Sequence, residues 1–259
     1  MPGADEPTEA GAGARYAHAS LLYWQGRTDE ALAGYRATLE CARSAGAAAR
    51  EADAQFALAF ALGISKSWGD AHAAAQAAEA IYAELGDTMG ATNARFTDAY
   101  ISSLSGEWEQ AADQLRAVLV EVDAHGDDFW SLNTRIVLAW TLTRLDRIEE
   151  AREILRGNLT GSIELGDRSM ENMTVQALAT IAALDGDTDR ALRLAGVAEA
   201  IAEDLGGKAP DELVIGLDPV TLAMERGVSQ EAADALLLEG RGIGTEAARD
   251  LAFGIAEKT

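Results

Sequence analysis

Cysteine is nearly absent from this sequence of 259 residues, which carries Cys41 alone. One cysteine can form neither an internal disulfide nor a multi-cysteine metal site. Prolines number only four and aromatic residues make up 6% of the chain, so little interrupts helix formation. No run of 18 apolar residues could cross a bilayer, and the start lacks the pattern of a secretory signal. We therefore expect a helical, cytoplasmic protein that does not enter a membrane.

Positive charge is also scarce, because 21 lysines and arginines stand against 43 aspartates and glutamates, for a net charge of −22. An acidic field of this size repels nucleic acid backbones and anionic membranes. We therefore expect no direct binding to nucleic acid. Solubility is the simplest role for the acidity, and an acidic recognition surface is the alternative.

What the sequence does contain is a repeat with a period of 40 residues. Two columns of alanine keep the same step as a column of glycine, and the two alanine columns lie 12 residues apart in every unit. Such small-residue columns suit two helices that cross closely, as in tetratricopeptide-type (TPR) repeats. The columns are Gly46, Gly86, Gly126, Gly166 and Gly206; Ala19, Ala59, Ala99, Ala139 and Ala179; Ala31, Ala71, Ala111, Ala151 and Ala191.

The chain divides into three parts on this reading. Residues 1–12 lack periodicity and read as a disordered lead-in. Residues 13–207 form five helical repeats, in which glycine ends one helix and a following aspartate, as in Gly86-Asp87, can cap the next. Residues 208–259 carry three short helix candidates and read as a C-terminal helical cap, with Gly240 to Gly244 as a flexible turn rather than a phosphate-binding loop. The predicted fold is an all-α, right-handed α-solenoid of about five TPR-like helix pairs with this cap.

Several segments resemble the helical repeats of large bacterial transcriptional regulators. LYWQGRTDEALAGYRATLECARSAG and ALATIAALDGDTDRALRLAGVAEAIAEDLGG are similar to repeats of MalT-like and LuxR-type ATPase regulators and of SARP-type regulators. The resemblance implies a sensor or protein-contact module, although the chain contains neither the ATPase core nor the DNA-binding helix-turn-helix of those regulators. The segment that follows their repeats is matched here by Glu239, Gly240, Arg241, Glu246 and Ala248, with Ile243 in place of the usual leucine.

The first helix of each pair lines the inner surface in repeats of this kind, and its stripe combines amides with aromatic residues. An asparagine side chain donates and accepts hydrogen bonds together, which suits a peptide backbone or a polar ligand. The aromatic rings supply apolar area. We expect Phe56 and Phe96 to pack between repeats, and Phe60, Tyr100 and Trp140 to face a groove. The stripe reads Asp53, Phe56, Phe60; Asn93, Phe96, Tyr100; Asn133, Ile136, Trp140.

Charged residues lie beside this stripe. Arg95 and Arg135 are one period apart, and Asp98 stands in a column that reads Leu58, Leu138 and Leu178 in three other repeats. A break of this kind often marks a functional or strained site, and the alternative is an ordinary Arg95–Asp98 ion pair along the helix. We predict a ligand-binding groove made by Phe60, Asn93, Arg95, Asp98, Tyr100, Asn133, Arg135 and Trp140.

The functional prediction is a non-catalytic binding or sensor module in bacterial transcriptional or signalling regulation. Its partner would be a peptide, a protein or a small-molecule effector. We expect no catalytic residues, no cofactor and no metal, since His18, His72 and His125 share no spacing. Two alternatives stay open. One is a cofactor-free enzyme whose aromatic-lined pocket uses Asp98, Arg95 and Arg135 for acid–base chemistry. The other is a passive assembly scaffold, in which the chain could also form a homodimer.

Overall fold

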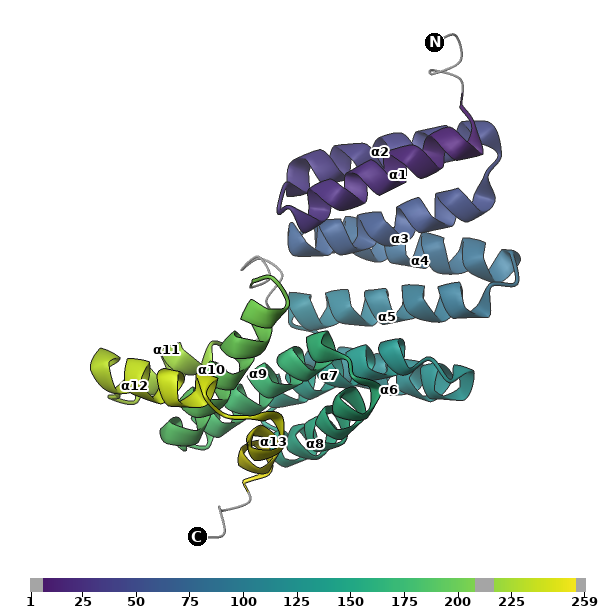
Figure 1. Cartoon of the computed structure of the whole chain (residues 1–259). Helices are drawn as coiled ribbons and strands as arrows, with labels where there is room; N and C mark the ends of the chain where they lie inside the picture. Colours follow the sequence, from purple (N-terminus) through teal and green to yellow (C-terminus); the bar gives the residue numbers. More distant parts are fainter. Residues whose placement is uncertain (1–6, 208–216, 255–259) are drawn as a thin grey trace. The chain divides into compact units, whose positions relative to one another are not determined.

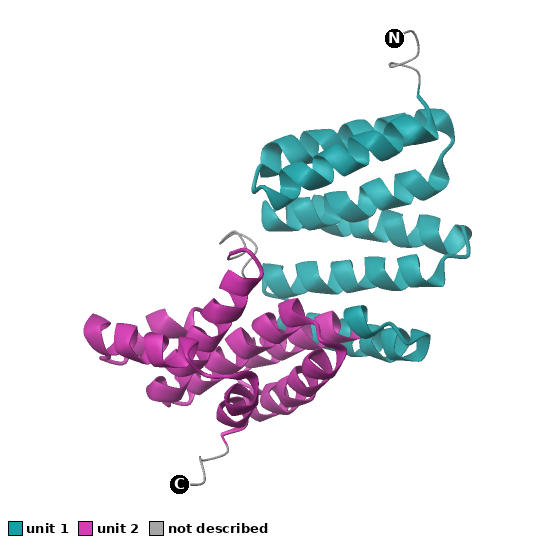
Figure 2. Cartoon of the chain, in the orientation of Figure 1, with its two compact units in different colours: residues 1–130, 210–213 teal, residues 131–209, 214–259 magenta. Residues whose placement is uncertain are grey.

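The computed structural model describes residues 7–207 and 217–254, and these residues form thirteen α-helices and no strand. The chain divides into two compact units, which Figure 2 distinguishes by colour. Unit 1 comprises residues 1–130 and 210–213, and unit 2 comprises residues 131–209 and 214–259. The boundary falls inside one helix of the array that the sequence predicts to be continuous over 13–207.

Unit 1 is a stack of helix pairs in which each helix packs on the next one along the chain (Figure 1). The first helix begins at Glu9, four residues before the predicted start, because the Thr8 side chain caps it by accepting from the Gly11 N–H at 3.0 Å. Its helices are α1 (Glu9–Trp24), α2 (Thr28–Ala45), α3 (Ala48–Ile64), α4 (Trp68–Glu84), α5 (Thr88–Ser105) and α6 (Trp108–His125), followed by the first turn of α7 (Asp128–Arg144).

Unit 2 continues the same kind of helix pairing and then adds three shorter helices. Pro219 begins the first of these, and Asp218 caps it by accepting from the Thr221 N–H at 3.1 Å. The predicted C-terminal helices are therefore present. The elements of unit 2 are the remainder of α7, α8 (Ile148–Leu165), α9 (Arg168–Leu184), α10 (Thr188–Asp204), α11 (Pro219–Glu225), α12 (Gln230–Arg241) and α13 (Thr245–Phe253).

The glycine column ends helices, as predicted. All five of its members have φ between 64° and 100°, the left-handed region that glycine enters without steric cost. The aspartate that follows three of them caps the next helix by accepting from a backbone N–H. Asp87 accepts from Gly90 at 2.8 Å and Asp167 accepts from Met170 at 3.0 Å.

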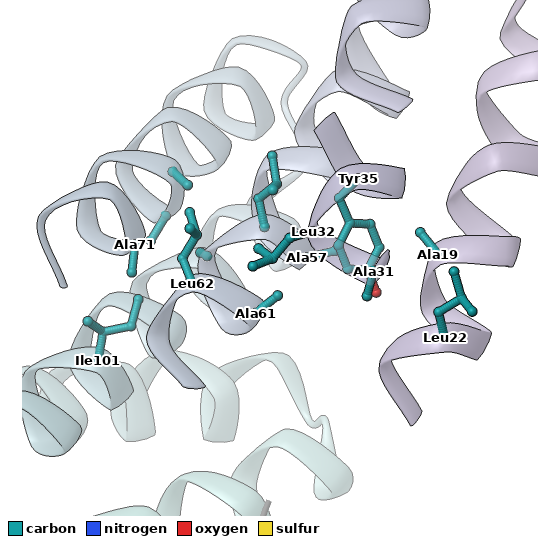
Figure 3. Close-up of a cluster of buried hydrophobic side chains, with 14 residues drawn as sticks. Ala19, Leu22, Ala31, Leu32, Tyr35, Ala57, Ala61, Leu62, Ala71 and Ile101 are labelled. Atoms are coloured by element: carbon teal, nitrogen blue, oxygen red, sulfur yellow. The ribbon is translucent and has the colours of Figure 1, made fainter. Parts of the chain in front are cut away.

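The alanine columns lie in the core. All ten of their members are 0% exposed, as expected for small side chains at positions where paired helices cross. In unit 1, Ala19, Ala31 and Ala71 belong to one buried cluster with Leu62 and Ile101 (Figure 3). The periodic alanines thus specify an all-α array of TPR-like helix pairs.

Helix α12 packs on α10, and its segment Glu239-Gly240-Arg241 contributes to this contact. Arg193 donates to Glu239 at 2.9 Å, and Arg241 donates to Glu199 at 2.7 Å. Gly240 is buried between these two ion pairs. Since Gly240 and Arg241 lie inside α12, the expectation of a flexible turn is wrong for the first two residues of that run. In the part of the chain that the structure describes, no helix is both long enough and apolar enough to span a bilayer.

Candidate functional site

Aromatic rings from three first-of-pair helices gather in unit 1. Phe56 and Phe60 of α3 contact each other with ring centroids 5.2 Å apart, and Phe60 lies 5.7 Å from Tyr100 of α5. Trp130, in the first turn of α7, closes the cluster at 5.1 Å from Phe96 and 6.3 Å from Phe56. Helical spacing on α3 and α5 therefore brings the predicted aromatic rows together. Trp130 was missed, because the columns one and two repeats earlier hold Gly90 and Arg50 and give no periodic signal.

Burial separates these rings into two groups. Phe96 and Tyr100 are only 2% and 6% exposed, whereas Phe56, Phe60 and Trp130 are half-buried. Burial raises the pKa of Tyr100 well above its ordinary value, and the nearby Tyr23 raises it further. The expectation that Tyr100 faces an open groove is wrong, because its ring packs against Phe96 and Phe60. Phe60 is half-buried, and its place in a groove stays a prediction.

Asn93 lies one helical turn before Phe96 on the same face of α5. Its Oδ1 atom is buried and has no hydrogen-bond partner among residues 7–207 and 217–254. The equivalent residue one repeat earlier, Asp53, accepts a hydrogen bond from the Tyr82 hydroxyl at 2.9 Å. In the repeat that contains Asn93, the position of Tyr82 is taken by the buried Val122, which has no donor to offer. The aromatic cluster of unit 1 therefore borders an amide oxygen that still requires a donor.

Arg95 points toward second-of-pair helices rather than toward the aromatic rings. Its guanidinium donates to Glu79 of α4 at 2.9 Å and to Glu121 of α6. Burial alone would raise the pKa of Glu121, but hydrogen bonds from Arg95 and Thr92 outweigh it and lower that pKa. Arg95 thus forms its ion pairs with two glutamates of unit 1.

Asp98 likewise joins the second-of-pair helices on either side of α5. Its Oδ1 lies 2.6 Å from His72 Nδ1 of α4, and its Oδ2 accepts from Gln114 of α6 at 3.3 Å. The carboxylate that breaks the leucine column is therefore held by these two side chains. Arg95 and Asp98 therefore do not form the ion pair that the sequence analysis considered as an alternative, because each bonds to side chains of other helices.

The remaining predicted residues lie in unit 2, on α7. Asn133, Arg135 and Trp140 are half-buried, and Ile136 between them is buried. The Trp140 Nε1 atom is buried and has no acceptor among the described residues. Within unit 2, α7 therefore also carries an unmatched polar atom on the stripe that the sequence analysis selected.

Metal binding has no support from side-chain clustering. No group of three or more histidine, cysteine, aspartate or glutamate side chains with metal-binding geometry occurs in the described part of the chain. Within the described residues, the carboxylate contact of His72 is with Asp98.

Comparisons with known proteins identify the fold. No protein-family model and no curated protein sequence matches the chain. Solved structures do match. A Rap protein in complex with competence and sporulation factor has a TM-score of 0.70 at 16% identity over 88% of this chain, and the apo form of RapI has a TM-score of 0.60 at 15% identity over 87%. The chain spans about 63% and 61% of those two proteins.

A third structure links the repeats to the TPR class directly. A putative kinesin light chain from Podospora anserina, with nearly identical TPR-like repeats, has a TM-score of 0.57 at 15% identity and covers 74% of this chain, which spans 95% of it. At these identities the likeness concerns the fold. The chain is therefore a TPR-like helical repeat protein, and its finer resemblance to bacterial transcriptional regulators stays a prediction.

Proposed function

We propose that this chain is a non-catalytic binding module that recognises a peptide segment of a partner protein through the first-of-pair helices. In unit 1 the contact surface is formed by Phe56, Phe60, Asn93 and Trp130, which we call the aromatic–amide surface. The observation that carries the proposal is the unmatched Asn93 Oδ1, one helical turn from Phe96, whose ring contacts the half-buried Trp130. A buried acceptor without a donor costs about 1–3 kcal/mol, so a ligand N–H that reaches it is favoured.

An extended peptide fits this chemistry. Its backbone offers an N–H at regular intervals, and its apolar side chains can lie on the exposed parts of the rings. A solved neighbour of the same fold, the Rap protein, is in complex with competence and sporulation factor. A structure of similar fold is thus seen with a bound factor. In this chain, the aromatic–amide surface offers rings and a hydrogen-bond acceptor that a bound peptide could contact.

The other predicted site residues take different roles in the proposal. Tyr100 packs against Phe60 and Phe96 within the ring cluster, whereas Arg95 and Asp98 bond to side chains of α4 and α6. In unit 2, Asn133, Arg135 and Trp140 remain candidate contacts on α7 and are tested separately. The enzyme alternative draws no support from unit 1, where Asp98 and Arg95 bond to different partners. We further propose a regulatory context, which rests on the resemblance of the repeats to bacterial regulators.

A displayed library of random heptapeptides tests the function. We expect enriched peptides to bind the full chain, with Phe60→Ala and Asn93→Leu each weakening binding by at least about tenfold. Val120→Ala on α6 is the matched control, since Val120 is 72% exposed and lies on a second-of-pair helix that contributes no residue to the aromatic–amide surface. Trp140→Ala reports on α7 in the same assay. Absence of enrichment, or enriched peptides that bind all variants equally, would contradict the proposal.

A further inference from the structure

The first helix exposes a stripe in which the positions of Ala14 and Leu21 are buried in every later repeat. Leu21 and Trp24 are 62% and 68% exposed, and Ala14, Ala17 and His18 are exposed on the same side of α1. These residues recur at helical spacing, so they form one continuous strip along the helix. We call this strip, made by Ala14, Ala17, His18, Leu21 and Trp24, the outer face of α1.

The residues equivalent to Ala14 and Leu21 in the later repeats are buried. In α3, α5, α7 and α9 the eight equivalent side chains are at most 1% exposed. Within unit 1, α2 packs on α3 and α4 packs on α5, and within unit 2, α8 packs on α9. A second-of-pair helix thus covers this position, and α1 presents the same surface without one. The equivalent residues are Ala54, Ala94, Thr134 and Thr174; Ala61, Ile101, Thr141 and Ile181.

The polar positions beside the strip indicate the charge of the helix that would cover it. Arg95, in the column of Arg15, donates to Glu79 of the preceding helix α4. Arg15 is exposed, and no ion pair to it is recorded among residues 7–207 and 217–254. A helix seated on α1 as α4 is seated on α5 would therefore place its equivalent of Glu79 opposite Arg15.

The second polar position reverses the charges seen at the α4–α5 junction. There, Asp98 of α5 meets His72 of α4. The column of Asp98 holds His18 in α1, so the complementary residue on a covering helix is a carboxylate at the position of His72. Two acidic side chains, seven residues apart and thus on one helix face, would complement α1.

We propose that the outer face of α1 is a docking surface for a single amphipathic helix of another protein. That helix carries small apolar residues along one face and acidic residues opposite Arg15 and His18. A second copy of this chain fits less well. Its last repeat helix, α10, is already covered by α12, and two α1 helices packed together would bring Arg15 and His18 toward their own counterparts.

The α4 helix provides a template for a defined probe. Its contacts with α5 come from His72, Ala75, Ala78, Glu79 and Tyr82. The probe is a synthetic peptide of residues 68–84 that carries H72E and is stapled between positions 73 and 77. The staple fixes the helix, because an isolated peptide of this length is only marginally helical in water.

Fluorescence polarisation of the labelled probe with the full chain is the test. We expect saturable binding that L21E and R15E each weaken by at least about tenfold. L165E is the matched control, because Leu165 is a similarly exposed leucine, 52% accessible, on α8. We also expect a probe with E79R to bind the R15E chain more tightly than the wild-type chain, and hydrogen exchange to slow in α1 when the first probe binds.

Three results would overturn the proposal. The first is no saturation up to about 1 mM probe, a concentration far above the Kd expected for a specific helix-binding site. The second is binding that L21E and R15E leave unchanged. The third is a dimer in solution that L21E dissociates, since a second copy would then cover the outer face. Circular dichroism of each variant verifies the fold, which substitutions at exposed positions should preserve.

Discussion

Gly196 of α10 and Gly240 of α12 lie at the point where the two helices cross, and neither has room for a side chain. A Cβ atom on Gly196 would lie 2.1 Å from the Leu237 carbonyl oxygen and 3.0 Å from the Gly240 Cα. A Cβ atom on Gly240 would lie 2.1 Å from the Arg193 carbonyl oxygen. Both obstacles are backbone atoms, so the helices themselves would have to separate.

Gly240→Ala is therefore expected to destabilise the packing of α12 on α10. Overpacking against rigid backbone costs about 2–3 kcal/mol, despite the better helix propensity of alanine. Urea unfolding followed by circular dichroism measures the change. Gly157→Ala is the control, because Gly157 lies inside α8 with nothing within 4 Å of its Cβ position. That substitution should raise stability by about 0.5–1 kcal/mol. Equal effects of the two substitutions would contradict the close crossing.

The pair His72–Asp98 can be exchanged for the residues found one repeat earlier. Leu32 and Leu58 hold the equivalent positions and are both buried in the core of unit 1. Asp98→Leu alone leaves His72 without its acceptor, and we expect a loss of about 1–3 kcal/mol. The double variant with His72→Leu should recover most of this loss, because a well-packed apolar pair often equals a buried ion pair in stability.

A double-mutant cycle from urea unfolding checks this exchange. The coupling free energy between His72 and Asp98 should exceed about 1 kcal/mol. The ion pair of Asp113 with Arg116, in which Asp113 is 82% exposed, is the control and should couple by only a few tenths of a kcal/mol. Independent, additive effects of His72→Leu and Asp98→Leu would show that the contact contributes nothing.

The sequence determines the repeat architecture because its signals are local and periodic. The glycine column, the Gly-Asp junctions and both alanine columns require only backbone geometry and close helix crossing, and the structure places all of them as predicted. The helix start at Glu9 was missed because Thr8 follows a proline- and glycine-rich run that suggests disorder. The role of Gly240 was missed because Gly-Arg-Gly-Ile-Gly looks like a turn when its partner, Arg193, is 47 residues away.

The candidate site was harder to predict than the fold. Spacing along α5 places Phe96 and Tyr100 on one face, but it does not reveal how deeply neighbouring repeats bury them. Arg95 and Asp98 depend on Glu79, His72 and other side chains of different helices, which differ between repeats. The orphaned Asn93 oxygen depends on Val122 replacing a tyrosine, a difference that becomes meaningful once Asp53 is seen to contact Tyr82.

Alkaline pH is expected to destabilise unit 1, where all five tyrosines lie. Burial raises the pKa of Tyr23 to about 12 and also raises the pKa of Tyr100. A raised folded-state pKa contributes stability that is complete below the unfolded value of about 10 and is lost as the pH rises toward the folded value. Acidification below pH 10 leaves this contribution intact.

Tyr100→Phe isolates one such contribution. Near pH 11 the unfolded phenol ionises and the folded one does not, so the wild-type chain loses about 1.4 kcal/mol at this residue. The variant should escape that loss and be relatively more stable near pH 11 than near pH 7. Urea unfolding at both pH values, with phenolate absorbance as a second signal, measures the difference. An unchanged difference between variant and wild type at the two pH values would mean that Tyr100 ionises freely in the folded chain.

Asn93→Leu should increase stability while it removes binding. The substitution eliminates a buried oxygen without a recorded partner and adds apolar area beside Phe96, for a gain of about 1 kcal/mol in the free energy of unfolding. Asp53→Leu, in the same column one repeat earlier, is the matched control. It deprives the Tyr82 hydroxyl of its acceptor and should cost about 1–3 kcal/mol. Residues kept at the expense of stability are characteristic of functional surfaces. If Asn93→Leu instead destabilises the chain as Asp53→Leu does, then Asn93 is a structural residue, and the aromatic–amide surface loses the donor-seeking group on which its proposed function rests.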